Sequence, residues 1–180
     1  MRRTLITLPE GGLGRVRAHL FPMDGLCEEA AFLLTHATES PAGLVLSVFE
    51  TLLISPEGFA SRSRFYLELT DETRAMVIKR AHDLDAGLIE CHSHPGQHGA
   101  CFSWSDLHGF DEFVPHVHWR LPGRAYAAIV FACDSVDALV WARPRAEATL
   151  VDLIRADGHE ISPTQLTLAN WSDLYARSPI

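Results

Sequence analysis

The stretch GLIECHSHPG, residues 87–96, contains the pattern from which the rest of this sequence is best interpreted. Its first five residues are apolar except for Glu90 and predict a buried strand. His92 and His94 follow at the end of that strand, and a Pro-Gly pair then turns the chain away. Residues i and i+2 of a strand point to the same side, so both imidazoles can converge on one point, ~2.0–2.1 Å from each nitrogen as in zinc sites. The stretch therefore predicts a pair of metal ligands at a strand end.

A candidate third ligand comes next in the chain. Asp106 lies early in a helix predicted over residues 105–113. Two histidines, one carboxylate and an open position are typical of catalytic zinc sites, not of closed structural ones. In such a site the metal lowers the pKa of water to about 7, a nearby carboxylate accepts the proton, and a hydroxyl such as that of Ser103 can stabilise an oxyanion.

Each of these signals has a purely structural interpretation when taken alone. A pair of half-buried histidines on a strand is common, and a Ser before a helix often only caps it. The order of apolar strand, H-S-H-P-G, short loop, S-x-x-D and helix is what favours a metal site.

This order resembles that of the JAMM (MPN-plus) zinc metalloprotease family, whose pattern is a Glu far upstream, then H-[ST]-H-P and, after a short loop, S-x-x-D. The matching strings are H-S-H-P at residues 92–95 and S-W-S-D at residues 103–106. The resemblance implies that Zn²⁺ is bound by His92, His94 and Asp106, and that Ser103 stabilises the oxyanion.

The loop between the two strings departs from the family pattern. Eight residues separate His94 from Ser103, one more than is usual in the family. The extra residue can be placed in a glycine-flanked part of the loop. Asp111 remains an alternative to Asp106 as ligand, and Ser105 an alternative to Ser103.

The family's general base is a Glu in a segment resembling E-x-x-G-L-L. The segment EAAFLL at residues 29–34 is similar to it, with Phe32 in place of the glycine. The resemblance implies that Glu29 is the catalytic base, with Glu28 and Glu50 as alternatives. Glu90 should share the face of His92, but the family uses no acid there.

The resemblance also implies a fold and a function. It implies an MPN (JAB1/MPN) fold and a zinc-dependent isopeptidase or peptidase that cleaves after the carboxyl-terminal glycine of a ubiquitin-like protein, in deconjugation or precursor processing. The implied partners are that protein, its conjugates, and activating and conjugating enzymes encoded in the same operon, as in bacterial members. The alternatives are a peptidase that processes a sulfur-carrier protein, a non-catalytic MPN scaffold, and an unrelated metal-dependent hydrolase.

Strand and helix signals alternate irregularly along the chain and predict an α/β fold with a single mixed β-sheet flanked by helices. We expect one domain over residues 1–180, with a motif-bearing core at about 15–140 and a tail of unknown role from about 144. Asp24 is a possible helix cap, and residues 26–34 fit a helix or a strand equally well. Helices are expected at 70–84 and 105–113. Strands are expected at 3–8 (an edge strand), 15–21, 42–54, 65–69, 87–91, 125–133, 136–142 and 150–154.

Composition excludes several classes of protein. The 180 residues carry a net charge of −8, which argues against a nucleic-acid partner because phosphate binding needs a basic surface. No run reaches the ~18 apolar residues of a membrane span. The four cysteines are too scattered for a disulfide framework, so a cytoplasmic location is expected.

Overall fold

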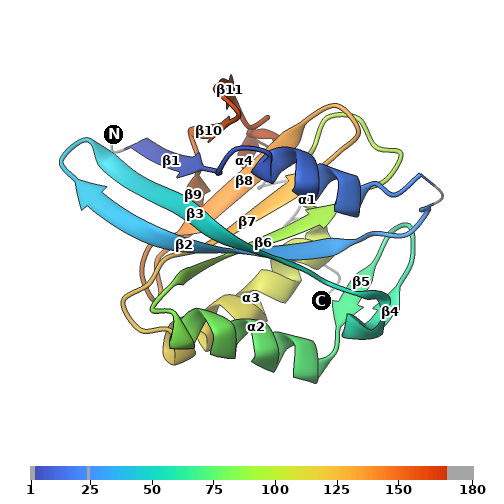
Figure 1. The fold of residues 1–180 in the computed structure, drawn as a ribbon, viewed down its shortest axis with the longest axis horizontal. Helices are drawn as coiled ribbons and strands as arrows, with labels where there is room; N and C mark the ends of the chain where they lie inside the picture. The colour runs from blue at the N-terminus through green and yellow to red at the C-terminus, as the bar shows by residue number, and fades with distance from the viewer. Residues whose placement is uncertain (1–2, 24, 170–180) are drawn as a thin grey trace.

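A computed structural model describes residues 3–23 and 25–169 of the chain, so residues 1–2, Asp24 and residues 170–180 lie outside the described part. The described strands form a nine-stranded mixed sheet in the order β11-β10-β1-β3-β2-β6-β7-β8-β9 and a separate two-stranded sheet of β4 and β5 (Figure 1). The strands of the large sheet are β1 (Arg3–Thr7), β2 (Ala30–Ser40), β3 (Gly43–Leu53), β6 (Gly87–Ser93), β7 (Tyr126–Phe131), β8 (Val136–Trp141), β9 (Thr149–Leu150), β10 (Leu153–Ala156) and β11 (His159–Ile161). The small sheet consists of β4 (Phe59–Arg62) and β5 (Leu67–Leu69).

Helices cover both faces of the large sheet. The face that carries α2 (Asp71–Asp83) and α3 (Trp104–Arg120) is opposite the face that carries α1 (Gly12–Leu20) (Figure 1). Neighbouring residues of one strand contribute to opposite faces: Leu88 lies in the core under α2 and α3, and Ile89 in the core under α1. Strands that are buried on both faces have nearly continuous apolar sequences, as the central strands here do. A short α4 (Leu166–Ala169) and a 3-10 turn (Pro56–Gly58) complete the described elements.

The mixed α/β class expected from the sequence is confirmed, as are several of its elements. The helix expected at 70–84 is α2, and Thr70 caps it by accepting a hydrogen bond from Thr73 N at 3.1 Å. The strands expected at 125–133 and 136–142 pair antiparallel as β7 and β8. The expectation of one sheet was incomplete, because β4 and β5 form a second one.

Four local predictions were wrong, each for a physical reason. The strand expected at 150–154 is divided between β9 and β10, because the chain passes there from pairing with β8 to pairing with β1. The strand expected at 15–21 is part of α1, where Val16 and Leu20, four residues apart, are buried on one helix face. The strand at residues 3–7 is not an edge strand, because it pairs in parallel with both β3 and β10. The helix expected at 105–113 continues past Pro115 to Arg120, since its apolar face remains buried against the sheet.

The central position of β6 determines where the candidate site forms. This strand pairs antiparallel with β2 and parallel with β7. Its carboxyl end, with His92, therefore meets the amino end of β2, where Ala30 is the partner of His92. No helix in the described ranges is long and apolar enough to cross a membrane.

Candidate metal centre

The two histidines of the H-S-H stretch are buried at the end of β6. His92 is 2% exposed and His94 is 3% exposed, and their ring centroids are 5.1 Å apart. His94 continues the ladder one residue beyond the strand, because its N–H donates to Phe131 O on β7 at 2.8 Å. Pairing with β2 and β7 fixes the backbone of His92, and the bond to Phe131 fixes that of His94, so both rings are held on a rigid element.

Asp106 reaches this pair from the first turn of α3. Its Oδ2 lies 3.5 Å from His92 Nε2 and 3.3 Å from His94 Nε2. One ligand atom from each of the three residues lies within 4.8 Å of the other two, the one such group of three or more among the described residues. Asp111, the alternative ligand, is not in this group.

The capping residue of α3 holds the Asp106 side chain in place. Ser103 Oγ accepts a hydrogen bond from Asp106 N at 3.2 Å, while Ser103 N and Ser103 Oγ both donate to Asp106 Oδ2 at 2.7 Å. This is a capping box with Asp at its third helical position. It brings Ser103, the residue expected as oxyanion donor, to the edge of the triad. Ser105 is the second residue of α3 and takes no part in the capping box.

Glu29, the base expected from the resemblance, and its neighbour Glu28 lie in different surroundings. Glu29 forms an ion pair with Arg62 of β4. Glu28, which the sequence left as an alternative, is buried, and its Oε1 lies 3.8 Å from His94 Nε2. Consecutive side chains of an extended segment point to opposite sides, so only one of the two acids can face the histidines.

The backbone around these acids is fixed from two directions. Glu28 N donates to Ser63 O at 2.7 Å, beside the β4–β5 hairpin. Ser93, between the two histidines, accepts from Glu29 N through its hydroxyl at 3.0 Å and donates its own N–H to Glu29 O at 3.1 Å. The middle residue of H-S-H therefore sets the position of the neighbouring acid.

The other carboxylates lie elsewhere or play another part. Glu50, also left open by the sequence, accepts two hydrogen bonds of 2.8 Å from Arg80 at the surface. Glu90 accepts from Tyr126 O–H at 2.7 Å, and burial raises its pKa. It lines a cavity of 280 Å³ together with His92 and Asp106, so the expectation that it shares the face of His92 is confirmed.

The electrostatics of the triad are those of tightly paired buried groups. Burial raises the pKa of Glu28 from 4.5 to about 7; the charge on His92 opposes this shift and that on Asp106 adds to it. Burial disfavours the charged form of His92, but Asp106, Glu90 and Glu28 outweigh burial and raise its pKa to about 9. Burial would raise the pKa of Asp106, but His92 and His94 outweigh burial and hold it far below its usual range.

The buried polar atoms fit a cation. Neither ring nitrogen of His92 makes a hydrogen bond within the described residues, and neither does Nδ1 of His94. Buried polar groups without partners are rare in native structures and call for an explanation, such as an ion. Two imidazoles and a carboxylate are a donor set that suits Zn²⁺.

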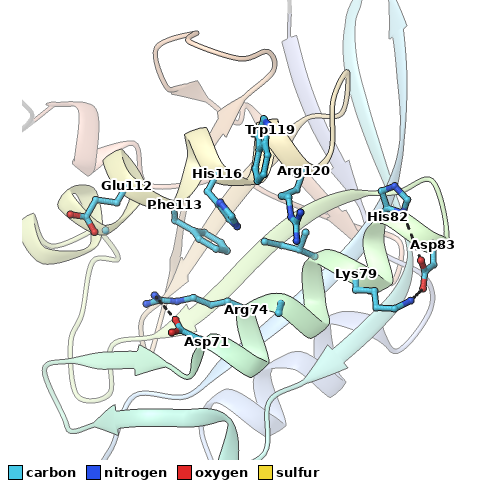
Figure 2. A pocket seen from close by; sticks show the side chains of 13 residues that line it. Asp71, Arg74, Lys79, His82, Asp83, Glu112, Phe113, His116, Trp119 and Arg120 are labelled. Atoms are coloured by element: carbon cyan, nitrogen blue, oxygen red, sulfur yellow. Dashed lines mark hydrogen bonds and ion pairs between the residues drawn. The ribbon is translucent and has the colours of Figure 1, made fainter.

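A larger pocket of 1010 Å³ lies between α2 and α3. Figure 2 shows charged side chains of α2 that pair within the helix: Arg74 with Asp71, and Lys79 with Asp83. Trp119 stands exposed at the rim of the pocket. None of the three candidate ligands lines it, so the candidate chemistry lies at the end of β6.

Comparison with known proteins does not assign a family. No family model and no curated protein matches the chain. A solved structure that it resembles is the STIL N-terminal domain of Trichoplax adhaerens, at 9% identity and a TM-score of 0.38. The match covers 76% of this chain and 41% of that one. So weak a likeness defines neither the fold family nor the function.

Proposed function

We propose that the protein is a zinc-dependent peptidase or isopeptidase of JAMM type with an MPN-like fold. It would cleave after the carboxyl-terminal glycine of a ubiquitin-like protein, in deconjugation or precursor processing. The observation that carries the proposal is the convergence of His92, His94 and Asp106 in a buried site, with the Glu28 carboxyl 3.8 Å from His94. Because four chemically matched groups meet there, a metal-dependent hydrolase is favoured over a scaffold.

Each side chain has a defined task in this proposal. His92, His94 and Asp106 hold the zinc, which when bound supplies a Lewis acid that polarises the scissile carbonyl and acidifies water. Glu28 accepts a proton from the attacking water and later donates it to the leaving amine. A base with a pKa near neutrality can do both, and burial gives Glu28 a pKa of about 7.

Ser103 completes the set at the start of α3. Its hydroxyl lies within hydrogen-bond distance of Asp106, at the exposed rim of the triad. A donor at this position can stabilise the negative charge that develops on the carbonyl oxygen. It would then have to exchange its bond to Asp106 for one to the substrate.

The surroundings suit an extended peptide. The 280 Å³ cavity beside His92 is bounded by β5 on one side and α3 on the other. Among the described residues, β5 pairs only with β4, so its outer edge has no strand partner. A substrate tail can add to such an edge through backbone hydrogen bonds.

Metal analysis tests the proposal first. Wild-type protein loaded with Zn²⁺ and freed of excess metal should retain about one zinc per chain, and His92→Ala should retain almost none. His159→Ala is the matched control, because His159 is exposed on β11, an edge strand of the large sheet. Equal zinc in wild type and His92→Ala would overturn the site.

Cleavage is tested next with a ubiquitin-like protein fused through its terminal glycine to a reporter. Zinc-loaded wild type should release the reporter, and Glu28→Gln should retain zinc but lose about 10²–10⁴-fold in rate. A full zinc complement with no cleavage of such fusions would leave the metal site standing and refute the substrate class. Equal rates for Glu28→Gln and wild type would refute the role of Glu28.

A further inference from the structure

The loop between the two halves of the metal motif has no regular secondary structure, and two distant segments hold it. On one side lies the turn between β7 and β8. Gly99 N donates to Asp134 Oδ1 of this turn at 3.1 Å, and Ala100 N donates to Ser135 Oγ at 2.8 Å. On the other side lie residues 164–168, which we call the strap. The loop is therefore fixed by residues at least 35 positions away from it.

The strap bonds directly to the backbone of the loop. Thr164 Oγ1 donates to Ala100 O at 2.5 Å, and Thr167 Oγ1 accepts from Phe102 N at 2.9 Å. Ala100, Phe102 and Thr167 are all at most 1% exposed. These backbone groups have no access to water, so the strap supplies partners that they could not replace.

A buried carboxylate anchors the strap to the sheet. Asp137 of β8 is 0% exposed and accepts four hydrogen bonds: from Ala138 N, Gln165 N and Thr167 N at 3.0 Å, and from Thr167 Oγ1 at 2.5 Å. Gln165 has a φ of 60°, in the left-handed region of backbone conformation that residues other than glycine rarely adopt. Such a conformation persists when the surrounding contacts determine it. The strap is thus held in a defined conformation by its contacts with β8.

Phe102, which the strap holds, connects the histidine ligands to Asp106 along the chain and contacts one of the histidines. The ring of Phe102 makes an edge contact with His92, at 5.7 Å between centroids. The next residue, Ser103, caps α3 and bonds to Asp106. Movement of Phe102 would therefore remove the ring that packs against His92 and displace Ser103, the cap that holds Asp106.

We propose that Asp137 and Thr167 are positioning residues of the metal centre, which act through Phe102 to fix Asp106 against the two histidines. This rests on the proposed zinc site and gives a role to residues 164–168, for which the sequence offered none. It also accounts for how the long loop is accommodated: the strap satisfies backbone groups of that loop.

The variant Thr167→Val tests this proposal. It removes the hydroxyl that bridges Asp137 and Phe102, but keeps the side-chain volume and the hydrogen bond from the backbone N–H of residue 167 to Asp137. Zn²⁺ affinity is measured by competition with a chelating dye, and backbone hydrogen exchange at residues 99–107 is measured on metal-free protein. We expect faster exchange at these amides and a zinc Kd raised about 10–100-fold, as for other residues that orient ligands. Thr167→Ser, which restores the hydroxyl, should stay within about threefold of wild type.

Ile6→Val is the matched control, since Ile6 is fully buried in the core under α1, on the opposite face of the sheet. It should change stability but leave the zinc Kd and exchange at 99–107 as in wild type. If Thr167→Val does not fold, Thr164→Val removes the second strap bond at a less buried position and should give the same two changes.

The outcomes are distinct. Unchanged exchange in the valine variants would show that the strap does not order the loop. Faster exchange with an unchanged zinc Kd would show that it orders the loop but not Asp106. Either result overturns the proposal. If wild type itself binds no more zinc than His92→Ala, the metal centre is wrong and the strap proposal falls with it.

Discussion

Replacement of Glu28 by Gln should change how the stability of the metal-free protein depends on pH. The pKa of this carboxyl is 4.5 unperturbed and about 7 in the fold, where burial disfavours its charge. The native state then keeps its proton to higher pH than the unfolded state does. The contribution of Glu28 to stability is therefore fully present below about pH 4.5 and is lost as the pH rises through about 7.

The size of the effect follows from the two pKa values. Between about pH 5 and about pH 8, linkage gives a loss of roughly 2 to 3 kcal/mol of unfolding free energy from this group. Glu28→Gln cannot ionise and should not show this loss. Urea unfolding of chelator-treated protein at several pH values, fitted by linear extrapolation, measures the difference.

Glu29→Gln is the matched control for this experiment. It removes the carboxylate that pairs with Arg62 and leaves Glu28 intact. It should therefore retain the wild-type fall in stability between about pH 5 and about pH 8. If Glu29→Gln abolished the fall and Glu28→Gln kept it, the two acids would be placed the wrong way round, and Glu29 would be the acid facing the histidines.

Further outcomes concern the metal. Asp106→Asn should weaken zinc binding in dye competition, whereas Asp111→Asn should not; the reverse would make Asp111 the ligand. Ser103→Ala should lower the unfolding free energy by about 1 kcal/mol, because the helix loses its cap. At equal zinc occupancy it should also lower kcat about 10²–10³-fold. An equal loss of kcat in Ser105→Ala would contradict the role of Ser103 as oxyanion donor. A chelator should abolish cleavage without unfolding the domain, as followed by circular dichroism, because cores on both faces of the sheet are complete without the ion.

The parts of the site that depend on local geometry could be predicted from the sequence. The strand period places His92 and His94 on one side, and the S-x-x-D spacing forms a capping box that carries Asp106. Both rest on contacts within a few residues. The structure brings these three residues together as the local patterns indicate.

The parts that failed depend on contacts distant in sequence. Residues 15–20 alternate basic and apolar side chains, which imitates a strand, yet Val16 and Leu20 also lie one helical turn apart and bury that face. The choice between helix and strand was made by the sheet beneath. No window of local sequence contains that information.

The choice between Glu28 and Glu29 has the same origin and a sharper consequence. Both acids precede the apolar run of β2, and a strand buried on both faces gives no alternation from which to read which acid faces inward. The outcome is fixed by Arg62, 33 residues away, and by Ser93, 64 residues away. Arg62 pairs with Glu29 and leaves its neighbour as the buried acid. A resemblance in sequence pattern can locate such a segment, but the ion pair decides which of its two carboxylates lies beside the histidines.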